Sequence, residues 1–309
     1  MKTDKTTLKR AFTKTTQRTS KRTSARNTAN SKVHEKAFQL LFVVSAAVSI
    51  FAVALICLFL FMNGIPAIGK IGVFQFLFGT QWSPLDIPAF YGIGSMIVAS
   101  LYVTAGAIII GVPIGLCTAV FLAKSCPKKL YKRIKPGISL LSGIPSVVYG
   151  FFGMAAIVPL FGSSLLTASV LLGIMILPTI IELCESAIRA VPDTYYEGAL
   201  ALGAAHHRSV WLIILPAAKS GILASIVLGI GRAVGETMAV IMVIGNQPRL
   251  ADSFLDGART LTGNIVLEMG YADGLHRDAL IATGVVLFIF ILIINLSFSV
   301  LTRREKSSR

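Results

Sequence analysis

The chain has 309 residues, of which 54% are hydrophobic and only 14% are charged, and its formal net charge is +15. Soluble globular domains carry about 25% charged residues, so this composition excludes an ordinary soluble domain and indicates that lipid surrounds most of the chain. The positive charge is compatible with nucleic acid or anionic lipid as a partner, but much of it falls in one terminal segment.

Residues 1–36 are rich in Thr, Ser, Lys and Arg and contain few large apolar side chains. Such a segment cannot bury a hydrophobic core, so we predict a disordered basic tail in the cytoplasm. A solvated tether that fixes the topology is the plainest interpretation, and binding to anionic membrane lipid is the second. We do not expect nucleic-acid binding.

The apolar run 37–62 predicts the first transmembrane helix. It is too long for the hydrophobic region of a signal peptide, and no cleavage-site pattern follows it. The sequence Asn63-Gly64-Ile65-Pro66 should end this helix. The following segment, up to residue 90, is mixed in polarity, and its aromatic residues predict a short interfacial helix near Phe74–Phe78.

Five further apolar stretches complete six predicted transmembrane helices, since each is long enough to cross a membrane. They cover 91–123, 138–161, 164–184, 217–245 and 278–301. The sequence therefore predicts an all-α integral membrane protein. Its first helix and outer segment occupy 37–90, its main transmembrane domain occupies 91–302, and a short cytoplasmic tail occupies 303–309.

The distribution of Lys and Arg orients these helices, because cytoplasmic loops of membrane proteins are enriched in both residues. With the N-terminus inside, most of the 29 Lys and Arg residues fall in the basic tail, in 124–136, in 185–219 and at the C-terminus. The outer segments contain only Lys70, Arg249, Arg259 and Arg277. Both termini are therefore predicted to be cytoplasmic, and Arg232 alone lies within the membrane.

The stretch Ser142–Gly153 leaves two interpretations open. Pro145 and the glycines can break or kink a helix, and broken backbone in a membrane is tolerated where it lines a cavity. Close packing of small residues between helices explains the same composition equally well.

A moderately polar loop, 192–216, separates the fourth and fifth predicted spans. Pro192 should bound a short helix through Tyr195–Leu202, capped by Asp193 or Thr194. Gly203 permits a left-handed turn, after which a second helix leads to the next span. A short helix lying across the membrane plane can fit a groove on a soluble partner, although an ordinary amphipathic loop is the alternative.

The motif in this loop consists of Glu197-Gly198-Ala199, Gly203, Ile213, Leu215 and Pro216. It resembles the EAA loop of type-I ABC-importer permeases, with Gly198 where the family has Ala. Other stretches are similar to the PstC-type phosphate permease branch. They are 78–84, 91–93, 143–153, 176–180 and 229–238, and the resemblance extends over about 67–302.

The resemblance implies that a separate ATPase docks on these seven positions of the loop. It implies a PstA-like second permease, a dimer of a PstB-like ATPase, and a PstS-like protein that delivers inorganic phosphate. The chain would then be the membrane subunit of an ATP-driven importer, within the membrane lipid. No cofactor is expected.

Arg232 and Glu236 fall within the predicted fifth span, four residues apart and hence on one helix face. Each is costly in lipid and should face a partner or an aqueous cavity. One interpretation is that Arg232 attracts the anion in the translocation path while Glu236 orients it or gates. The other is a structural ion pair that locks helices together. The resemblance implies the first.

No catalytic residues are predicted. The sequence lacks the G-x-x-x-x-G-K-[ST] pattern that cradles ATP phosphates, so ATP hydrolysis must occur in another polypeptide. The Cys and His residues show no metal-ligand spacing, so we expect no metal site. The alternatives are a permease for molybdate or sulfate, a secondary transporter, which leaves the loop motif unexplained, and a membrane enzyme.

Overall fold

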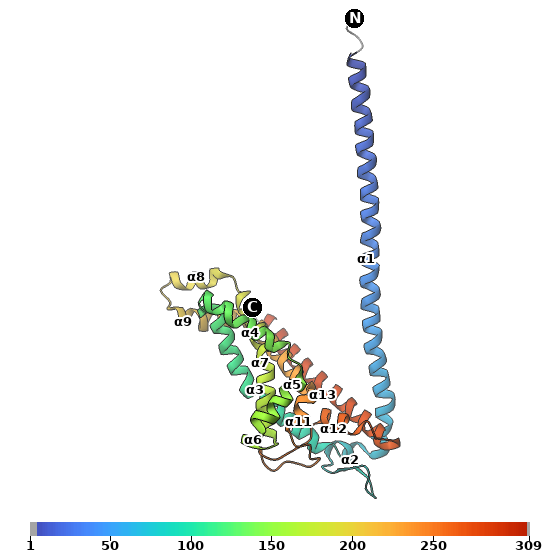
Figure 1. Cartoon of the computed structure of the whole chain (residues 1–309), viewed down its shortest axis with the longest axis vertical. Helices are drawn as coiled ribbons and strands as arrows, with labels where there is room; N and C mark the ends of the chain where they lie inside the picture. Colours follow the sequence, from blue (N-terminus) through green and yellow to red (C-terminus); the bar gives the residue numbers. More distant parts are fainter. Residues whose placement is uncertain (1–4, 308–309) are drawn as a thin grey trace. The chain divides into compact units, whose positions relative to one another are not determined.

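The computed structural model describes residues 5–307, and their side chains from 38 to 297 (Figure 1). The chain divides into two units, Met1–Phe59 and Leu60–Arg309. The first unit contains most of one helix, α1 (Lys5–Ile71), and the second contains the remaining helices and a small hairpin. The protein is therefore predominantly helical, as the sequence predicts.

Helix α1 differs from its prediction at both ends. Residues 5–36 continue the helix, although we expected disorder there. The reason is that no Gly or Pro precedes Gly64, so nothing interrupts a helix that the apolar run has already nucleated. At its other end the helix passes Pro66 and stops at Gly72, whose φ is +96°. The part Phe38–Ile71 is long and apolar enough to cross a membrane.

Gly64 lies in the part of the helix beyond the predicted end, and it packs closely against the last helix. A Cβ placed on Gly64 would lie 2.6 Å from the Val285 side chain and 3.1 Å from the Ala282 backbone. Both residues belong to α13 (Gly274–Ser307), the last helix. The glycine therefore serves close packing of two helices. Phe61 and Phe288 add an edge-on ring contact at 5.9 Å in the same region.

The outer segment folds into a short helix and a hairpin. Helix α2 (Val73–Phe78) confirms that a short helix forms where the aromatic residues predicted one. Strands β1 (Trp82–Ser83) and β2 (Phe90–Tyr91) pair antiparallel, with Trp82 opposite Tyr91. Buried side chains from this segment form one core cluster with α3, α12 and α13; it includes Phe76, Trp82, Met96, Leu261 and Leu280. The hairpin is a small β element that the all-α prediction lacked.

Helices α3 (Gly94–Val120) and α7 (Leu165–Arg189) pack along most of their lengths and form the centre of the second unit (Figure 1). Gly106, Gly111 and Gly115 of α3 lie directly against Ser169, Ile176 and Ile180 of α7. Of the stretch of α7 that is most apolar, 67% is buried. This helix is therefore largely surrounded by other parts of the second unit. A π-helical turn, η1 (Phe121–Ser125), extends α3.

The predicted span 138–161 is broken. Helix α4 (Lys128–Ser142) ends at Gly143, and α5 (Ser146–Phe152) begins after Pro145; η2 (Gly153–Ile157) and α6 (Val158–Phe161) continue it. The two halves meet at 100°, because Pro145 cannot continue the hydrogen-bond pattern of α4. This confirms the break at Ser142–Gly153. Among the described residues, five helices are long and apolar enough to span a membrane, or six with this bent pair.

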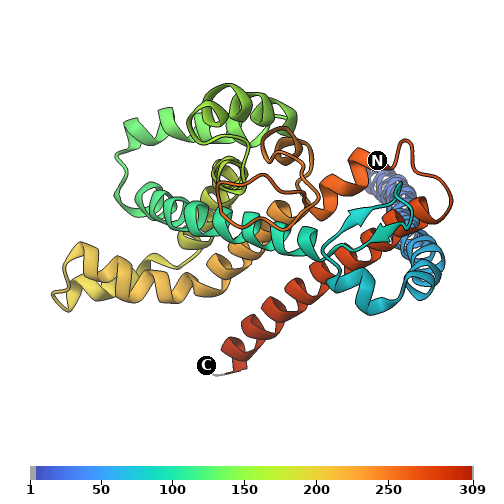
Figure 2. The same cartoon turned by 90° about the horizontal axis from the view of Figure 1, so that it is seen from below.

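The remaining elements complete the bundle, as the view along the other axis shows (Figure 2). They are α8 (Asp193–Ala201), α9 (His206–Ser209), η3 (Val210–Ile214), α10 (Leu215–Gly235), α11 (Met238–Val243) and α12 (Leu261–Glu268). The predicted span 217–245 is interrupted, because α10 ends at Gly235. At the C-terminus, α13 continues through the predicted tail to Ser307.

We expect Gly111→Ala to destabilise the protein, because the added methyl group would lie 2.9 Å from Ile176 and 3.0 Å from the Gly173 carbonyl oxygen. Overpacking of this kind costs about 1–3 kcal/mol. Gly137→Ala in α4 is the matched control, since nothing lies within 4 Å of its added Cβ. Thermal unfolding in detergent should show a lower midpoint for the first variant only. Equal midpoints would mean that the α3–α7 packing tolerates the methyl group.

Candidate functional site

The motif-bearing loop forms two helices joined by a sharp turn. Helix α8 ends in a Schellman motif: the Gly203 amide donates to the Leu200 carbonyl at 2.9 Å, and the Ala204 amide donates to the Ala199 carbonyl at 3.1 Å. Gly203 has a φ of +80°, which an L side chain rarely adopts. The predicted left-handed turn at this glycine is therefore present. From His206, the chain is helical as far as Gly235.

The seven predicted docking residues are divided between the surface and the interior. Glu197, Gly198, Gly203 and Pro216 are exposed, Ile213 and Leu215 are half-buried, and Ala199 is buried. The buried alanine fixes how α8 lies on the protein, while Glu197 on the same helix faces outward. The predicted side-chain cap is absent: Pro192 precedes α8, and Asp193 is its first residue.

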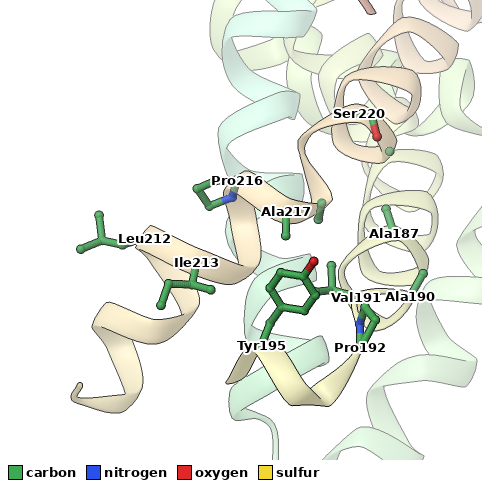
Figure 3. A pocket seen from close by; sticks show the side chains of 12 residues that line it. Ala187, Ala190, Val191, Pro192, Tyr195, Leu212, Ile213, Pro216, Ala217 and Ser220 are labelled. Carbon is green, nitrogen blue, oxygen red and sulfur yellow. The ribbon is translucent and has the colours of Figure 1, made fainter. Parts of the chain in front are cut away.

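A pocket of ≈ 690 Å³ opens beside the loop (Figure 3). The end of α7, the start of α8 and the η3–α10 helix form its walls, and Tyr195 extends from α8 between them. The side chains that line it are mostly apolar, while polar atoms contribute nearly half of its exposed surface; the lining residues are Ala187, Ala190, Val191, Pro192, Tyr195, Leu212, Ile213, Pro216, Ala217, Ala218, Ser220 and Gly221. Only Ile213 and Pro216 among these were predicted from the sequence as docking residues, and Pro192 and Tyr195 were predicted only as parts of the short helix.

Large apolar side chains are exposed along the loop, and two of them, Tyr195 and Leu212, line the pocket. Leu202 is 91% exposed, and Trp211 is also exposed. Exposed apolar surface on a membrane protein is typical of a site of contact with a protein or with lipid. The sequence indicated this site only by the presence of large apolar residues in a loop that also contains charged residues.

Polar contacts hold the loop against the end of α3. Lys124 of η1 pairs with Asp193 at 3.3 Å. His206 lies between two hydroxyl groups, with its Nε2 3.2 Å from Ser125 Oγ and its Nδ1 2.7 Å from Tyr196 Oη. The loop is thus attached at the beginning of α8 and at the beginning of α9, on both sides of the Gly203 turn.

Arg232 and Glu236 are not arranged as the sequence predicts. Arg232 lies in the last turn of α10 and donates from Nη1 to Thr179 Oγ1 of α7 at 2.9 Å. Glu236 is the residue that follows α10, and its extended ψ of 132° ends the helix there. The Glu236 carboxylate accepts from the Ala239 amide at 3.2 Å, at the start of α11. An Arg232–Glu236 ion pair is not among the described ion pairs, and the roles of both residues stay predictions.

A small polar cavity of ≈ 10 Å³ adjoins Glu236 where α10 ends. Four hydroxyl-bearing residues contribute to it, namely Ser100 and Thr104 of α3, Thr262 of α12 and Thr260, which caps α12. Its size allows about one water molecule. Within residues 38–297, the structure brings together no group of three His, Cys, Asp or Glu residues that could hold a metal ion.

Comparison with known proteins shows which family the chain resembles. The family described as "Binding-protein-dependent transport system inner membrane component" matches residues 111–307. The "Probable ABC transporter permease protein YqgH" of Bacillus subtilis (strain 168) is 36% identical over 266 residues, which cover 81% of this chain and 86% of that protein. The "Phosphate transport system permease protein PstC" of Pasteurella multocida (strain Pm70) is 33% identical over 261 residues, covering 75% and 81%.

Solved structures show the same fold. An inward-facing MetNI methionine ABC transporter matches with a TM-score of 0.57 and 21% identity, over 68% of this chain and 95% of that one. A bacterial transporter for the import of alginate matches with a TM-score of 0.54 and 17% identity, over 86% and 99%. These matches confirm the predicted type-I ABC-importer permease fold. The chain therefore belongs to the binding-protein-dependent inner-membrane permeases of ABC transporters, whose partners are an ATPase and a substrate-binding protein.

Proposed function

We propose that this chain carries inorganic phosphate across the inner membrane as one of two permease subunits, with both termini in the cytoplasm. The relatives named as phosphate permeases support phosphate as the substrate. A PstS-like protein would deliver phosphate, a PstA-like permease would complete the path, and a PstB-like ATPase dimer would bind ATP. Chemistry on phosphate is not part of the function.

The observation that carries the proposal is the shape of the motif-bearing loop. Helix α8 exposes Glu197, and the pocket beside it is lined mostly by apolar side chains, of which Tyr195 and Leu212 are exposed. A soluble partner that inserts a side chain into this pocket would hold α8 and the start of α10 at once. Displacement of the partner on ATP binding would then move α10, which carries Arg232 near its other end.

Arg232 is the residue that we propose for contact with the anion. It is partly buried, and its described hydrogen bond goes to a neutral hydroxyl group. A guanidinium with donors left over suits phosphate oxygens, because its planar fork binds them in pairs. Glu236 would act at the break between α10 and α11, where its carboxylate holds the first turn of α11.

The alternative substrates are other oxyanions such as molybdate and sulfate, since a cationic path favours anions in general. Uptake of labelled phosphate by the reconstituted complex, measured with each competing anion in excess, decides between them. Dependence on ATP and insensitivity to dissipated ion gradients would exclude a secondary transporter.

We expect Glu197→Lys to weaken docking of the ATPase without affecting membrane insertion, because Glu197 is exposed on α8 beside the pocket. Co-purification of the ATPase with the membrane subunits should fall. Asp86→Lys makes the same charge change in the exposed β1–β2 connection and should retain the ATPase. If both variants retained it equally, Glu197 would have no part in docking.

We expect Arg232→Gln to abolish phosphate uptake while the complex still assembles and hydrolyses ATP. Gln keeps a donor toward Thr179 but removes the charge that would attract the anion. Uptake is normalised to assembled complex. Because Arg232 and Glu236 are not paired, the exchanged variant Arg232→Glu with Glu236→Arg should also be inactive. Uptake restored by the exchange, or a loss explained by lower complex yield, would contradict the proposed role.

A further inference from the structure

Glu185 is a buried carboxylate outside the docking motif and the proposed path. It lies one turn before the end of α7 and is 2% exposed. Lys135 of α4 reaches it at 3.0 Å, and Arg189 of its own helix reaches it at 2.8 Å. A buried carboxylate that loses its partners costs about 3–5 kcal/mol, whereas apolar residues could fill the same space without that risk. Its presence therefore calls for a role in positioning.

Arg189 extends the contact to two further segments. Its Nη2 donates to the Leu122 carbonyl oxygen of η1 at 2.8 Å, and its guanidinium lies over the Tyr131 ring of α4 at 4.8 Å. An apolar cluster of Leu122, Ile138 and Ile181 packs beneath these contacts. The end of α7, the η1 turn and α4 are thus joined by ionic, stacking and apolar contacts together.

The same η1 turn also contacts the motif-bearing loop, residues 192–216, which the proposed function makes the docking loop. Lys124 pairs with Asp193 of α8, and Ser125 hydrogen-bonds with His206 of α9. The η1 turn therefore contacts both the end of α7 and the docking loop, and Arg189 at that end of α7 also contacts α4.

Helix α4 leads from these anchors toward the proposed path. Beyond its 100° bend, α5 packs closely on α11: a Cβ added to Gly150 would lie 2.5 Å from Met242 Sδ and 3.2 Å from Ala239 Cα. Ala239 is the residue whose amide binds the Glu236 carboxylate. A route of contacts therefore runs from the docking loop through η1, the end of α7, α4, α5 and α11 to Glu236, without passing along α10.

We propose that Glu185 locks α4 to the docking loop as one rigid unit, so that movement of the loop reaches α5, α11 and Glu236. Glu185 is then a positioning residue for transport, acting through Lys135 and Arg189. This inference rests on the proposed function in one respect, namely that an ATPase moves the loop. The rigid connection between α4 and the loop involves residues of this chain alone.

The first test measures phosphate transported per ATP hydrolysed in the reconstituted complex. Glu185→Gln keeps the shape and removes the charge, so the ratio should fall by at least about fivefold, the lower end of typical coupling effects, while ATP hydrolysis continues. Glu182→Gln, one turn earlier on α7 with a single hydrogen bond to Ser139, is the matched control and should keep the ratio. A proportional loss of transport and hydrolysis in Glu185→Gln would overturn the proposal.

The second test follows the rigid unit directly. Spin labels at Lys132→Cys on α4 and Ala201→Cys on α8, both exposed positions, report the distance between the two helices after replacement of the native cysteines. The distance should be narrow and equal with and without trapped ATP, and Glu185→Gln should broaden it. A change between the two states in the otherwise unaltered protein would overturn the proposal.

A second variant and a measurement without the ATPase separate failure of this inference from failure of folding or of the proposed function. If Glu185→Gln does not fold, Arg189→Lys keeps the charge but loses the forked donor and the ring stacking, and it should broaden the same distance. If the ATPase does not bind this chain at all, the proposed function fails, whereas the label distance in the membrane subunit alone still decides whether α4 and α8 form one unit.

Discussion

The close packing of α3 on α7 is the constraint on which the second unit depends. Lipid supplies no hydrophobic force that would hold two apolar helices together, so association relies on close fit. Gly106, Gly111 and Gly115 provide that fit by letting the α7 side chains approach the α3 backbone. Helices α4, α5, α10 and α11 then pack on α7 in turn. The end of α7 leads into the motif-bearing loop, and Thr179 in its middle part binds Arg232.

Two buried carboxylates connect α4 and the outer hairpin to the neighbouring helices. Glu185 joins α7 to α4, and Glu268 does the same for the outer segment. Trp82 Nε1 donates to Glu268 Oε2 at 2.8 Å, His276 Nε2 lies 2.8 Å from the same oxygen, and Arg259 pairs with the other oxygen. One side chain thereby connects the hairpin, α12 and α13. Both sites use charge where apolar contact alone would leave the orientation of a short segment undetermined.

The sequence predicts what depends on composition and local backbone chemistry. Hydropathy located the long helices, and Gly203 and Pro145 marked a turn and a break that the structure contains. It failed at two helix ends: α1 continues past Pro66, where Gly64 packs against α13, and α10 ends at Gly235, after which the Glu236 carboxylate accepts from the Ala239 amide. The pocket was also beyond reach, because Ala187, Tyr195 and Leu212 come together only through folding.

The bend at Pro145 has a consequence for the surrounding bilayer. Both halves cannot follow the membrane normal when they meet at 100°. If the apolar half, Ser146–Phe161, takes that direction, it extends about 24 Å at 1.5 Å per residue, less than the roughly 30 Å of hydrocarbon. Helix α4, with Lys128, Lys129, Lys132 and Arg133, then lies near the headgroups. Bilayer thickness would then affect the position of the short apolar half, and anionic lipid would attract the basic residues of α4, the helix whose Lys135 pairs with Glu185.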